Sequence, residues 1–323
     1  MASITFVPFL DGYFKEALDV IDVHLHSLRQ TVAEDIDLLV FDNGSCDELK
    51  EFLTTQHHSG VIDWLFLSKQ NLGKTGALNW IFSAMPNEFI VFTDSDVLFR
   101  PGWMQRSLEI FDSFDQVGIV SAQPAFFDGI PGVAEAAKQL AENKAVQISD
   151  EQPDPGILAE YCDGIGASDD VYQRLLQNRL KVATNQTSGV GAVVGTTHMQ
   201  FMLRRELARK LVPLPATMAL DPADDFDINR RMEALGYLQL SLPDPLVYHL
   251  GNSLKGRNTA EVDQVRLKGV TSLNITDSTE TSIRRDGFLK TLLSKAAARS
   301  STINRFIQRI YSLLFDVLYS DSK

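Results

Sequence analysis

Short apolar runs alternate with amphipathic stretches through the first hundred residues of the chain. The runs are rich in β-branched and aromatic residues, which favour strands, and the stretches carry apolar residues at helical spacing. We expect strands at residues 4–9, 37–41, 64–67 and 89–93. We expect helices at residues 13–28, 47–55 and 77–84. Continuous apolar strands that alternate with helices predict a parallel sheet covered by helices on both faces.

The pattern changes beyond residue 100. A helix is expected from Pro101, because proline suits the first helical turn, and another at residues 224–235 ends before Gly236. Further strands are expected at residues 117–121 and 246–249 and within the β-rich stretch 190–203. Residues 145–173 carry seven acidic residues and no Lys or Arg. We interpret this stretch as a solvated surface insertion or as a mobile loop over an acceptor pocket.

The composition is that of an ordinary globular protein, with 323 residues of which 44% are hydrophobic and 22% charged. Its 30 Lys and Arg against 42 Asp and Glu give a net charge of −12, which argues against general nucleic-acid binding but allows a local basic pocket. Cys46 and Cys162 form no paired motif, so no disulfide framework or zinc site is expected. Without a signal-peptide pattern or a long apolar run, we expect a cytoplasmic protein.

Polar residues gather where one of the expected strands ends. Asp94-Ser95-Asp96 follows directly on the strand that ends at Thr93. Because alternate side chains of an extended segment point the same way, Asp94 and Asp96 can flank one site. Two carboxylates so close repel each other unless a cation or protons intervene, and a hard divalent ion that carries a diphosphate would neutralise both. The same pattern also fits solvated residues that merely end a strand.

Three further segments join this pattern. Asp42-Asn43-Gly44-Ser45 ends the second strand, and the segment NLGKTGALN, which contains Asn71 and Lys74, opens a helix with a combination of groups suited to an anion. Late in the chain, the segment DDFDINRR opens a helix at residue 224, and YHLGN follows at residue 248.

The order and spacing of these motifs resemble those of glycosyltransferases of the GT-A fold, closest to family 2. The resemblance spans residues 4 to about 252. It implies an α/β, Rossmann-like GT-A fold with a mostly parallel central sheet and helices on both faces. It also implies transfer of a sugar from a nucleotide-sugar donor, with UDP-sugars favoured, to a hydroxyl on an acceptor that is a carbohydrate, a lipid-linked molecule or another compound.

The same resemblance implies roles for individual residues on the donor side. Asp42 would accept a hydrogen bond from the donor's base, and Pro8 and Phe9 would line the base pocket. Asn71 and Lys74 would border the nucleotide and its phosphates. The complete set of expected donor-binding residues is Pro8, Phe9, Asp42, Asn71, Lys74, Asp94 and Ser95.

The resemblance further implies a divalent metal, Mn²⁺ or Mg²⁺, and a general base. Asp96 would ligate the metal directly, Asp94 would join its shell, and His249 would bind the metal or the diphosphate. Asp225 would be the base, with Asp224 as the alternative. A metal Lewis acid offsets charge on the leaving phosphate, and one base on the opposite face of the sugar suffices for a single displacement with inversion.

The chain departs from the family pattern at two points. The first strand usually ends Pro-x-Tyr-Asn but here ends Pro8-Phe9-Leu10-Asp11, so which ring stacks on the base is open. The late acidic pair is Asp-Asp rather than Glu-Asp, Asp227 adds a third carboxylate, and either member of the pair could also be a helix N-cap.

Two rival functions fit the sequence less well. One is a catalytically inactive protein that binds a sugar nucleotide, and it is disfavoured because the acidic and histidine motif positions are all occupied. The other is a sugar-phosphate nucleotidyltransferase, which needs a loop rich in glycine and arginine after the first strand. The segment VPFLDGYF lacks that loop.

We expect a catalytic domain at residues 1–255, with a nucleotide-sugar half at 1–100 and an acceptor half at 101–255. Residues 256–323 would be a helical extension. Its segment 301–319 is amphipathic and basic, and could pack on the catalytic domain, self-associate into a homo-oligomer or dock peripherally on an anionic membrane. Among the histidines, His24 is interpreted as structural, and His198 is a candidate near the acceptor.

Overall fold

The computed structural model describes residues 1–32, 36–127, 129–215, 222–254 and 259–270. Residues Met1–Gly269 form one compact unit. The segment 301–319, with the three roles considered for it, lies outside the described residues. The domain division near residue 255 stays a prediction.

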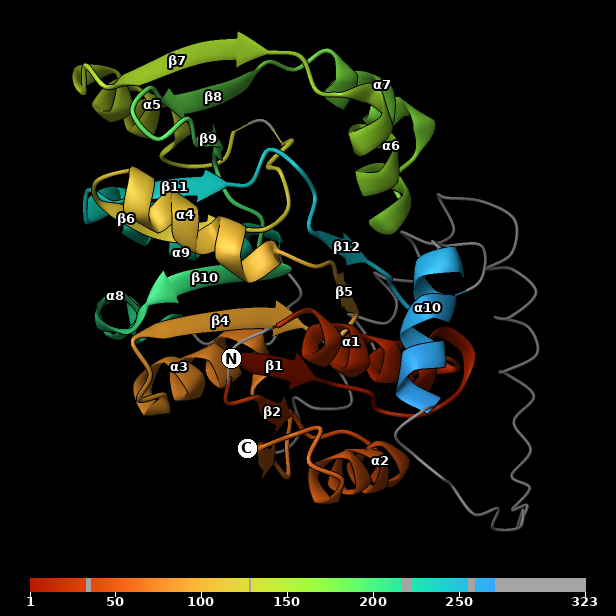
Figure 1. Cartoon of the computed structure of the whole chain (residues 1–323). Helices are drawn as coiled ribbons and strands as arrows, with labels where there is room; N and C mark the ends of the chain where they lie inside the picture. Colours follow the sequence, from red (N-terminus) through yellow and green to blue (C-terminus); the bar gives the residue numbers. More distant parts are fainter. Residues whose placement is uncertain (33–35, 128, 216–221, 255–258, 271–323) are drawn as a thin grey trace. The chain divides into compact units, whose positions relative to one another are not determined.

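Four neighbouring strands of the central sheet are parallel, as the sequence predicts. These strands are β1 (Ala2–Thr5), β2 (Leu39–Asp42), β3 (Trp64–Leu67) and β4 (Phe89–Asp94). They lie side by side in the order β3-β2-β1-β4, and β1 pairs in parallel with both β2 and β4. This arrangement brings the carboxyl ends of β1, β2 and β4 to one edge of the sheet (Figure 1).

The other six described strands pair in a mixed pattern, so the sheet is not mostly parallel, which corrects the expectation. These strands are β6 (Val117–Ser121), β7 (Val146–Glu151), β8 (Leu180–Asn185), β9 (Gly191–Val194), β10 (Gln200–Arg204) and β11 (Leu238–Ser241). Within the described residues the sheet has ten strands, continuing from β4 as β10-β6-β11-β9-β8-β7. Strand β10 runs antiparallel to both β4 and β6, and β7, β8 and β9 pair antiparallel in sequence order. Residues 186–190 join β8 directly to β9, and so short a connection allows only antiparallel pairing.

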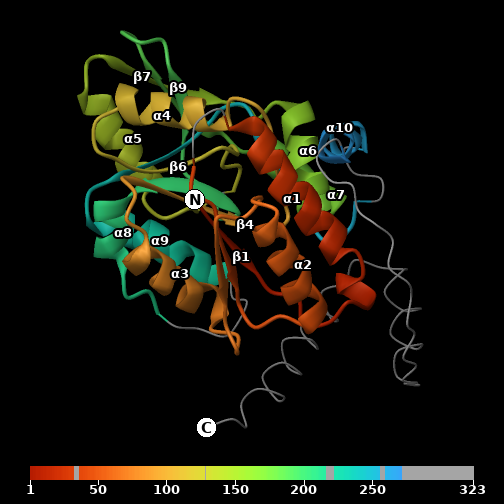
Figure 2. The same ribbon diagram turned by 60° about the horizontal axis from the view of Figure 1, so that its bottom comes forward.

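Helices cover both faces of the sheet, as expected (Figure 2). One face carries α1 (Ala17–Thr31), α2 (Asp47–His58), α4 (Trp103–Ser113) and α5 (Val133–Glu142), and the other carries α3 (Gly73–Ala84), α8 (Arg205–Leu211) and α9 (Pro222–Ala234). The alternation of the strands explains the two cores: Val40 packs in the first cluster, whereas its neighbours Leu39 and Phe41 pack in the second.

A two-stranded ribbon lies beside the main sheet. It pairs β5 (Val97–Phe99) with β12 (Val247–His249) in antiparallel register, with His249 opposite Val97. Helix α10 (Thr259–Val270) packs on this ribbon and on α1, through Val262 against a cluster that includes Val20 and Leu98. The ribbon therefore places a residue from the end of the fold next to the turn that follows β4.

The acidic stretch at residues 145–173 is not a loop. It forms β7, then α6 (Pro155–Gly164) and the start of α7 (Asp169–Leu176). Asp154 caps α6 by accepting hydrogen bonds from the backbone N–H groups of Gly156 and Ile157, and Pro155 occupies the first turn. Helices α6 and α7 share a small apolar core with Phe126. The stretch is an ordered insertion, and the mobile-loop interpretation was wrong.

Several element boundaries also differ from the expected ones. β1 ends at Thr5 rather than at residue 9, because the backbone of Val7 bonds to Ser45 and Cys46 in the turn after β2. A short 3₁₀ turn (Gly12–Phe14) precedes α1, which begins at Ala17. The expected strands 64–67 and 117–121 are found with the same bounds.

Candidate active site

The turn after β2 is tied to the beginning of α3 by two asparagines. The Asn43 side-chain amide donates to the Asn71 Oδ1 at 3.0 Å and to the Gly73 carbonyl at 3.2 Å, and Asn43 Oδ1 accepts from the Leu72 N–H at 2.8 Å. Asn71 in turn accepts from the Gly73 N–H at 2.8 Å. These bonds satisfy N–H groups at the start of α3 and let the helix begin at Gly73, four residues earlier than expected. The predicted role of Asn71 beside the nucleotide stays a prediction, and Asn43 is a residue that the sequence reasoning did not single out.

Gly44 allows this turn and the loop before α3 to touch. Its φ is +85°, and a Cβ there would lie 2.7 Å from the Gln70 carbonyl carbon and 2.8 Å from the Asn71 nitrogen. Both contacts are with backbone, which cannot rotate away. The DNGS and NLGK segments are thus a single structural unit, in which only glycine fits at position 44.

Asp42 is completely buried at the end of β2. Its carboxylate accepts from the Ser45 N–H at 3.2 Å, and the Ser45 hydroxyl accepts from the Val7 N–H at 3.0 Å. Burial raises the pKa of Asp42, against the opposing effect of the Ser45 hydrogen bonds. The structure therefore shows that Asp42 stabilises the turn that joins β1, β2 and α3. A hydrogen bond to Asp42 from the base of the donor stays a prediction.

Pro8 and Phe9, the predicted base-pocket residues, follow β1 at the same edge of the sheet. Phe9 is 43% exposed, and its ring meets the Phe14 ring edge-on at 5.6 Å between centroids. A planar group could stack on its exposed surface. Phe14 belongs to the 3₁₀ turn, so this turn supports the Phe9 ring from one side.

Lys74 and Asp94 form an ion pair across the end of the sheet. The Lys74 Nζ lies 3.0 Å from an Asp94 oxygen, and each side chain is about a third exposed. The same nitrogen donates to the His198 carbonyl at 3.4 Å and lies 5.2 Å from the centre of the Phe92 ring. A positive charge at the start of a helix, with backbone N–H groups beside it, favours an anionic ligand.

Asp96 and His249 form a second charged pair next to the first. The turn of Ser95 and Asp96 joins β4 to β5, and the pairing of β5 with β12 brings His249 Nε2 to 3.2 Å from an Asp96 oxygen. Burial alone would lower the pKa of His249, but the Asp96 charge and hydrogen bond raise it to about 9. Burial likewise opposes ionisation of Asp96, yet the His249 charge holds the pKa of Asp96 below its usual value.

Asp96 and His249 offer part of the ligand set of a divalent ion. Among the described residues, no three His, Cys, Asp or Glu side chains gather as a complete metal cage. Asp96 Oδ1 is buried and accepts no hydrogen bond within the described part of the chain, and His249 contributes an imidazole beside it. Mg²⁺ and similar ions are often held by one or two carboxylates and completed by substrate phosphates, so Asp96 and His249 fit such an ion. Asp94 is instead paired with Lys74.

His198 links this edge of the sheet to the helix that carries the expected base. Its Nε2 bonds with the side-chain oxygen of Asn229, which is fully buried in α9. The Asn229 amide also donates to Thr196 at 3.2 Å and bonds with Gln239 in β11. Asp224 and Asp225 lie at the third and fourth positions of α9, one turn before Asn229. Their roles as base stay predictions.

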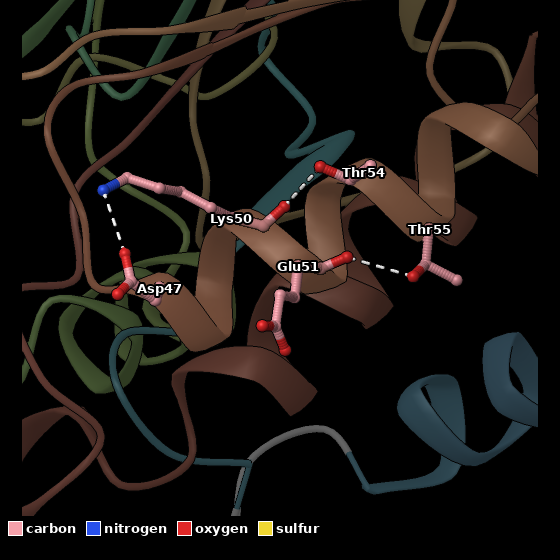
Figure 3. Close-up of a pocket in the computed structure, with 5 residues that line it drawn as sticks. All are labelled: Asp47, Lys50, Glu51, Thr54 and Thr55. Atoms are coloured by element: carbon pink, nitrogen blue, oxygen red, sulfur yellow. Dashed lines mark hydrogen bonds and ion pairs between the residues drawn. The ribbon is translucent and has the colours of Figure 1, made fainter.

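A separate hollow is lined by residues of α2 (Figure 3). Its lining groups bond within their own helix: Lys50 lies 3.5 Å from Asp47, Thr54 donates to the Lys50 carbonyl and Thr55 to the Glu51 carbonyl. None of the predicted site residues lines this hollow. It gives no indication of a ligand.

The fold and the site together define the structural class of the protein. A parallel set of strands that ends in a buried Asp, a lysine at a helix start and an Asp-Ser-Asp turn, continued by a mixed set of strands, is the GT-A architecture. The sequence model of glycosyl transferase family 2 matches residues 13–211, more than half of the chain. The chain belongs to this family, which confirms the family and the fold that the motifs predicted.

Individual relatives resemble parts of the chain. An uncharacterised glycosyltransferase of Nostoc sp. (strain PCC 7120) is 28% identical over 108 residues, which cover 33% of this chain and 31% of the relative. The match thus spans about a third of that relative's length. In the described residues, no helix has the length and apolar character needed to cross a bilayer.

Two solved structures are also similar. One is a mannosyltransferase from Pyrobaculum calidifontis in complex with GDP-Man and Mn²⁺, with a TM-score of 0.46, 14% identity and coverage of 97% of this chain and 80% of that one. The other is glucosyl-3-phosphoglycerate synthase from Mycobacterium tuberculosis in complex with Mn²⁺, UDP and glucosyl-3-phosphoglycerate, with a TM-score of 0.40, 16% identity and coverage of 86% and 81%.

Proposed function

We propose that this protein transfers a sugar from a nucleotide-sugar, with UDP-sugars the favoured donors, to an acceptor hydroxyl, with Mn²⁺ or Mg²⁺ bound and with inversion at the anomeric carbon. The observation that carries the proposal is the meeting of two charged pairs, Lys74–Asp94 and Asp96–His249, at the carboxyl edge of the sheet in a member of family 2. Open α/β sheets bind ligands at this edge.

The donor phosphates would lie near the start of α3. Lys74 supplies a positive charge there, and its ion pair with Asp94 holds the ammonium group in place until the donor arrives. The asparagine bonds from Asn43 and Asn71 fix the first turn of α3. The pocket for the base would be bounded by Phe9 and the turn that Asp42 builds.

Asp96 and His249 would hold the divalent ion, which, when bound, stabilises the negative charge that develops on the departing diphosphate. Asp96 presents a buried oxygen with no hydrogen bond from the described residues, which is a suitable anionic ligand. His249 presents Nε2 on the same side as this carboxylate. Asp94 would stay close enough to contribute to the electrostatics of the pair, since its charge also acts on His249.

The acceptor hydroxyl needs a base because its own pKa lies far above 7. Asp225 would take this proton, and Asp224 is the alternative one residue earlier. The Asn229–His198 bond supports this assignment by fastening α9 to the segment whose carbonyl contacts Lys74. A positioned carboxylate base typically contributes about 10²–10⁴-fold to the rate.

The test is UDP release from a panel of UDP-sugars with candidate acceptors, measured with and without Mn²⁺, in the wild type and in Asp96→Ala. We expect metal-dependent release that the variant loses, together with the metal dependence of its UDP binding. Asp115→Ala, which removes an exposed carboxylate before β6, is the matched control and should keep both. Activity and metal affinity of Asp96→Ala equal to wild type would contradict the metal assignment.

The same experiment separates the enzyme from an inactive sugar-nucleotide-binding protein. An inactive relative would be stabilised by UDP-sugars in thermal unfolding, because a ligand that binds the native state raises its stability, but would release no UDP. A nucleotidyltransferase would instead form a sugar nucleotide and pyrophosphate from a nucleoside triphosphate. Membership of the glycosyl transferase family supports the transferase over this second rival.

A further inference from the structure

The last turn of α6 contacts the strand that carries His249. The Gly164 carbonyl accepts a hydrogen bond from His249 Nδ1 at 2.9 Å. One residue earlier on each segment, Asp163 accepts a hydrogen bond from the Tyr248 hydroxyl at 2.6 Å. Two adjacent residues of β12 are thus bonded to two adjacent residues of α6, which comes from the acidic insertion in the acceptor half.

Arg100 fastens the same helix a turn earlier. Its guanidinium pairs with Glu160 of α6 and with Glu261 of α10, and it donates to the Pro245 carbonyl at 3.0 Å. The Arg100 side chain is only 18% exposed, so this is a mostly buried clamp. Arg100 follows β5, and the clamp therefore holds α6 against the two-stranded ribbon that positions His249.

At Gly164 the backbone of α6 comes very close to the backbone of β12. A Cβ at this position would lie 2.9 Å from the His249 carbonyl oxygen and 3.4 Å from the His249 Cβ. The nearer contact is with backbone of a paired strand, which cannot give way cheaply. Replacing glycine by alanine normally stabilises a helix, so the opposite outcome is expected here because of this contact alone.

The contact decides which ring nitrogen faces Asp96. Since the Gly164 carbonyl accepts the hydrogen bond from Nδ1, the His249 ring presents Nε2 to the Asp96 carboxylate at 3.2 Å. A carbonyl on the far nitrogen of a metal-binding histidine commonly sets its tautomer and ring orientation. We infer that the last turn of α6, through the Gly164 carbonyl, is the positioning element that aims His249 at the divalent cation shared with Asp96. This inference rests on the proposed function for the identity of the cation.

Mn²⁺ binding to the full chain, followed by electron paramagnetic resonance of free Mn²⁺ without any sugar nucleotide, tests the inference. In Gly164→Ala the dissociation constant should rise about 10-fold or more, the range seen when outer partners of metal ligands are changed. Gly156→Ala, at the other end of α6, is the matched control and should bind Mn²⁺ as the wild type does, because a Cβ there would meet only an Asp154 side-chain oxygen. Tyr248→Phe removes one bond and leaves Gly164 in place, so a smaller rise is expected.

A spectroscopic readout shows whether the bond to Gly164 holds the ring. With ¹⁵N-labelled histidine, the His249 Nδ1 proton should give a protected signal in the wild type, assigned by its loss in His249→Gln. The signal should be lost or strongly shifted in Gly164→Ala and retained in Gly156→Ala. A merely structural role would lower the melting temperature of Gly164→Ala while leaving both this signal and the Mn²⁺ affinity intact, and that result would overturn the inference.

The two proposals can fail separately. If Asp96→Ala loses Mn²⁺ but Gly164→Ala does not, the metal site stands and the positioning role is refuted. If the wild type binds Mn²⁺ tightly and Gly164→Ala weakly, yet no sugar nucleotide is turned over, the positioning role stands and the transferase activity is refuted.

Discussion

The contribution of His24 to the pH dependence of stability provides a specific test of the structure. It lies fully buried in α1, with Nδ1 bonded to the Val97 carbonyl at 2.7 Å and Nε2 to the Ser3 hydroxyl at 3.1 Å. Burial lowers the pKa of His24 from 6.5 to about 4, despite the Val97 hydrogen bond and the nearby Asp96 charge, which both raise it. The folded protein therefore keeps this ring neutral at a pH where the unfolded chain protonates it.

The sign and size of the effect follow from this difference. Between pH 6.5 and 4 the unfolded state binds the extra proton, so the contribution of His24 to the free energy of unfolding falls as the pH falls. At pH 7.5 the ring is neutral in both states and the contribution is near zero. At pH 5 the loss works out at about 2 kcal/mol, from roughly 1.4 kcal/mol for each unit of pKa shift.

Urea unfolding at pH 7.5 and 5.0, followed by tryptophan fluorescence, measures the effect in wild type and in His24→Asn. Asparagine keeps an N–H donor for Val97 and does not titrate, so the variant should lose about 2 kcal/mol less stability than wild type between the two pH values. Comparing the two proteins cancels groups such as His249, whose raised pKa changes stability in the opposite direction. His58→Asn, at an exposed position of α2, is the control and should follow the wild type. Equal losses in wild type and His24→Asn would refute the reasoning.

Three further predictions concern the site. Asp225→Asn should lower the rate at least ~10²-fold with little change in donor binding, measured by steady-state kinetics; a crippled Asp224→Asn beside a nearly normal Asp225→Asn would move the base by one residue. Asp42→Ala should weaken UDP binding by about 1–3 kcal/mol in calorimetry, and equal wild-type affinity for UDP, GDP and dTDP would argue that Asp42 only builds the turn. Gly60→Ala, at a similar φ and without a clash, should cost roughly 1–3 kcal/mol of backbone strain, and Gly44→Ala should destabilise the fold by more than that. Equal melting temperatures of the two variants would contradict the close approach of Gly44 to Gln70.

The sequence by itself determined the class of fold and the family. Apolar runs and turn residues are local signals, so the strands 64–67 and 117–121 and the alternation of the first half were predictable residue by residue. The motifs are also local, and their order along the chain was enough to indicate family 2. Two of the boundary errors share one cause: the end of β1 and the start of α3 depend on hydrogen bonds to the DNGS turn, which lies far away in the chain.

Only the tertiary structure decided how the charged groups pair. The sequence suggested that Asp94 and Asp96 share one site, but Asp94 pairs with Lys74, and Asp96 pairs with His249 across the β5–β12 ribbon. The acidic stretch gave no sign that Gly164 would contact His249, since a glycine inside a helical segment has no side chain whose type signals a partner. Pairing between residues so far apart in the sequence depends on tertiary packing and on the free-energy cost of burying an unpaired charge. Neither can be predicted from a local pattern of residues.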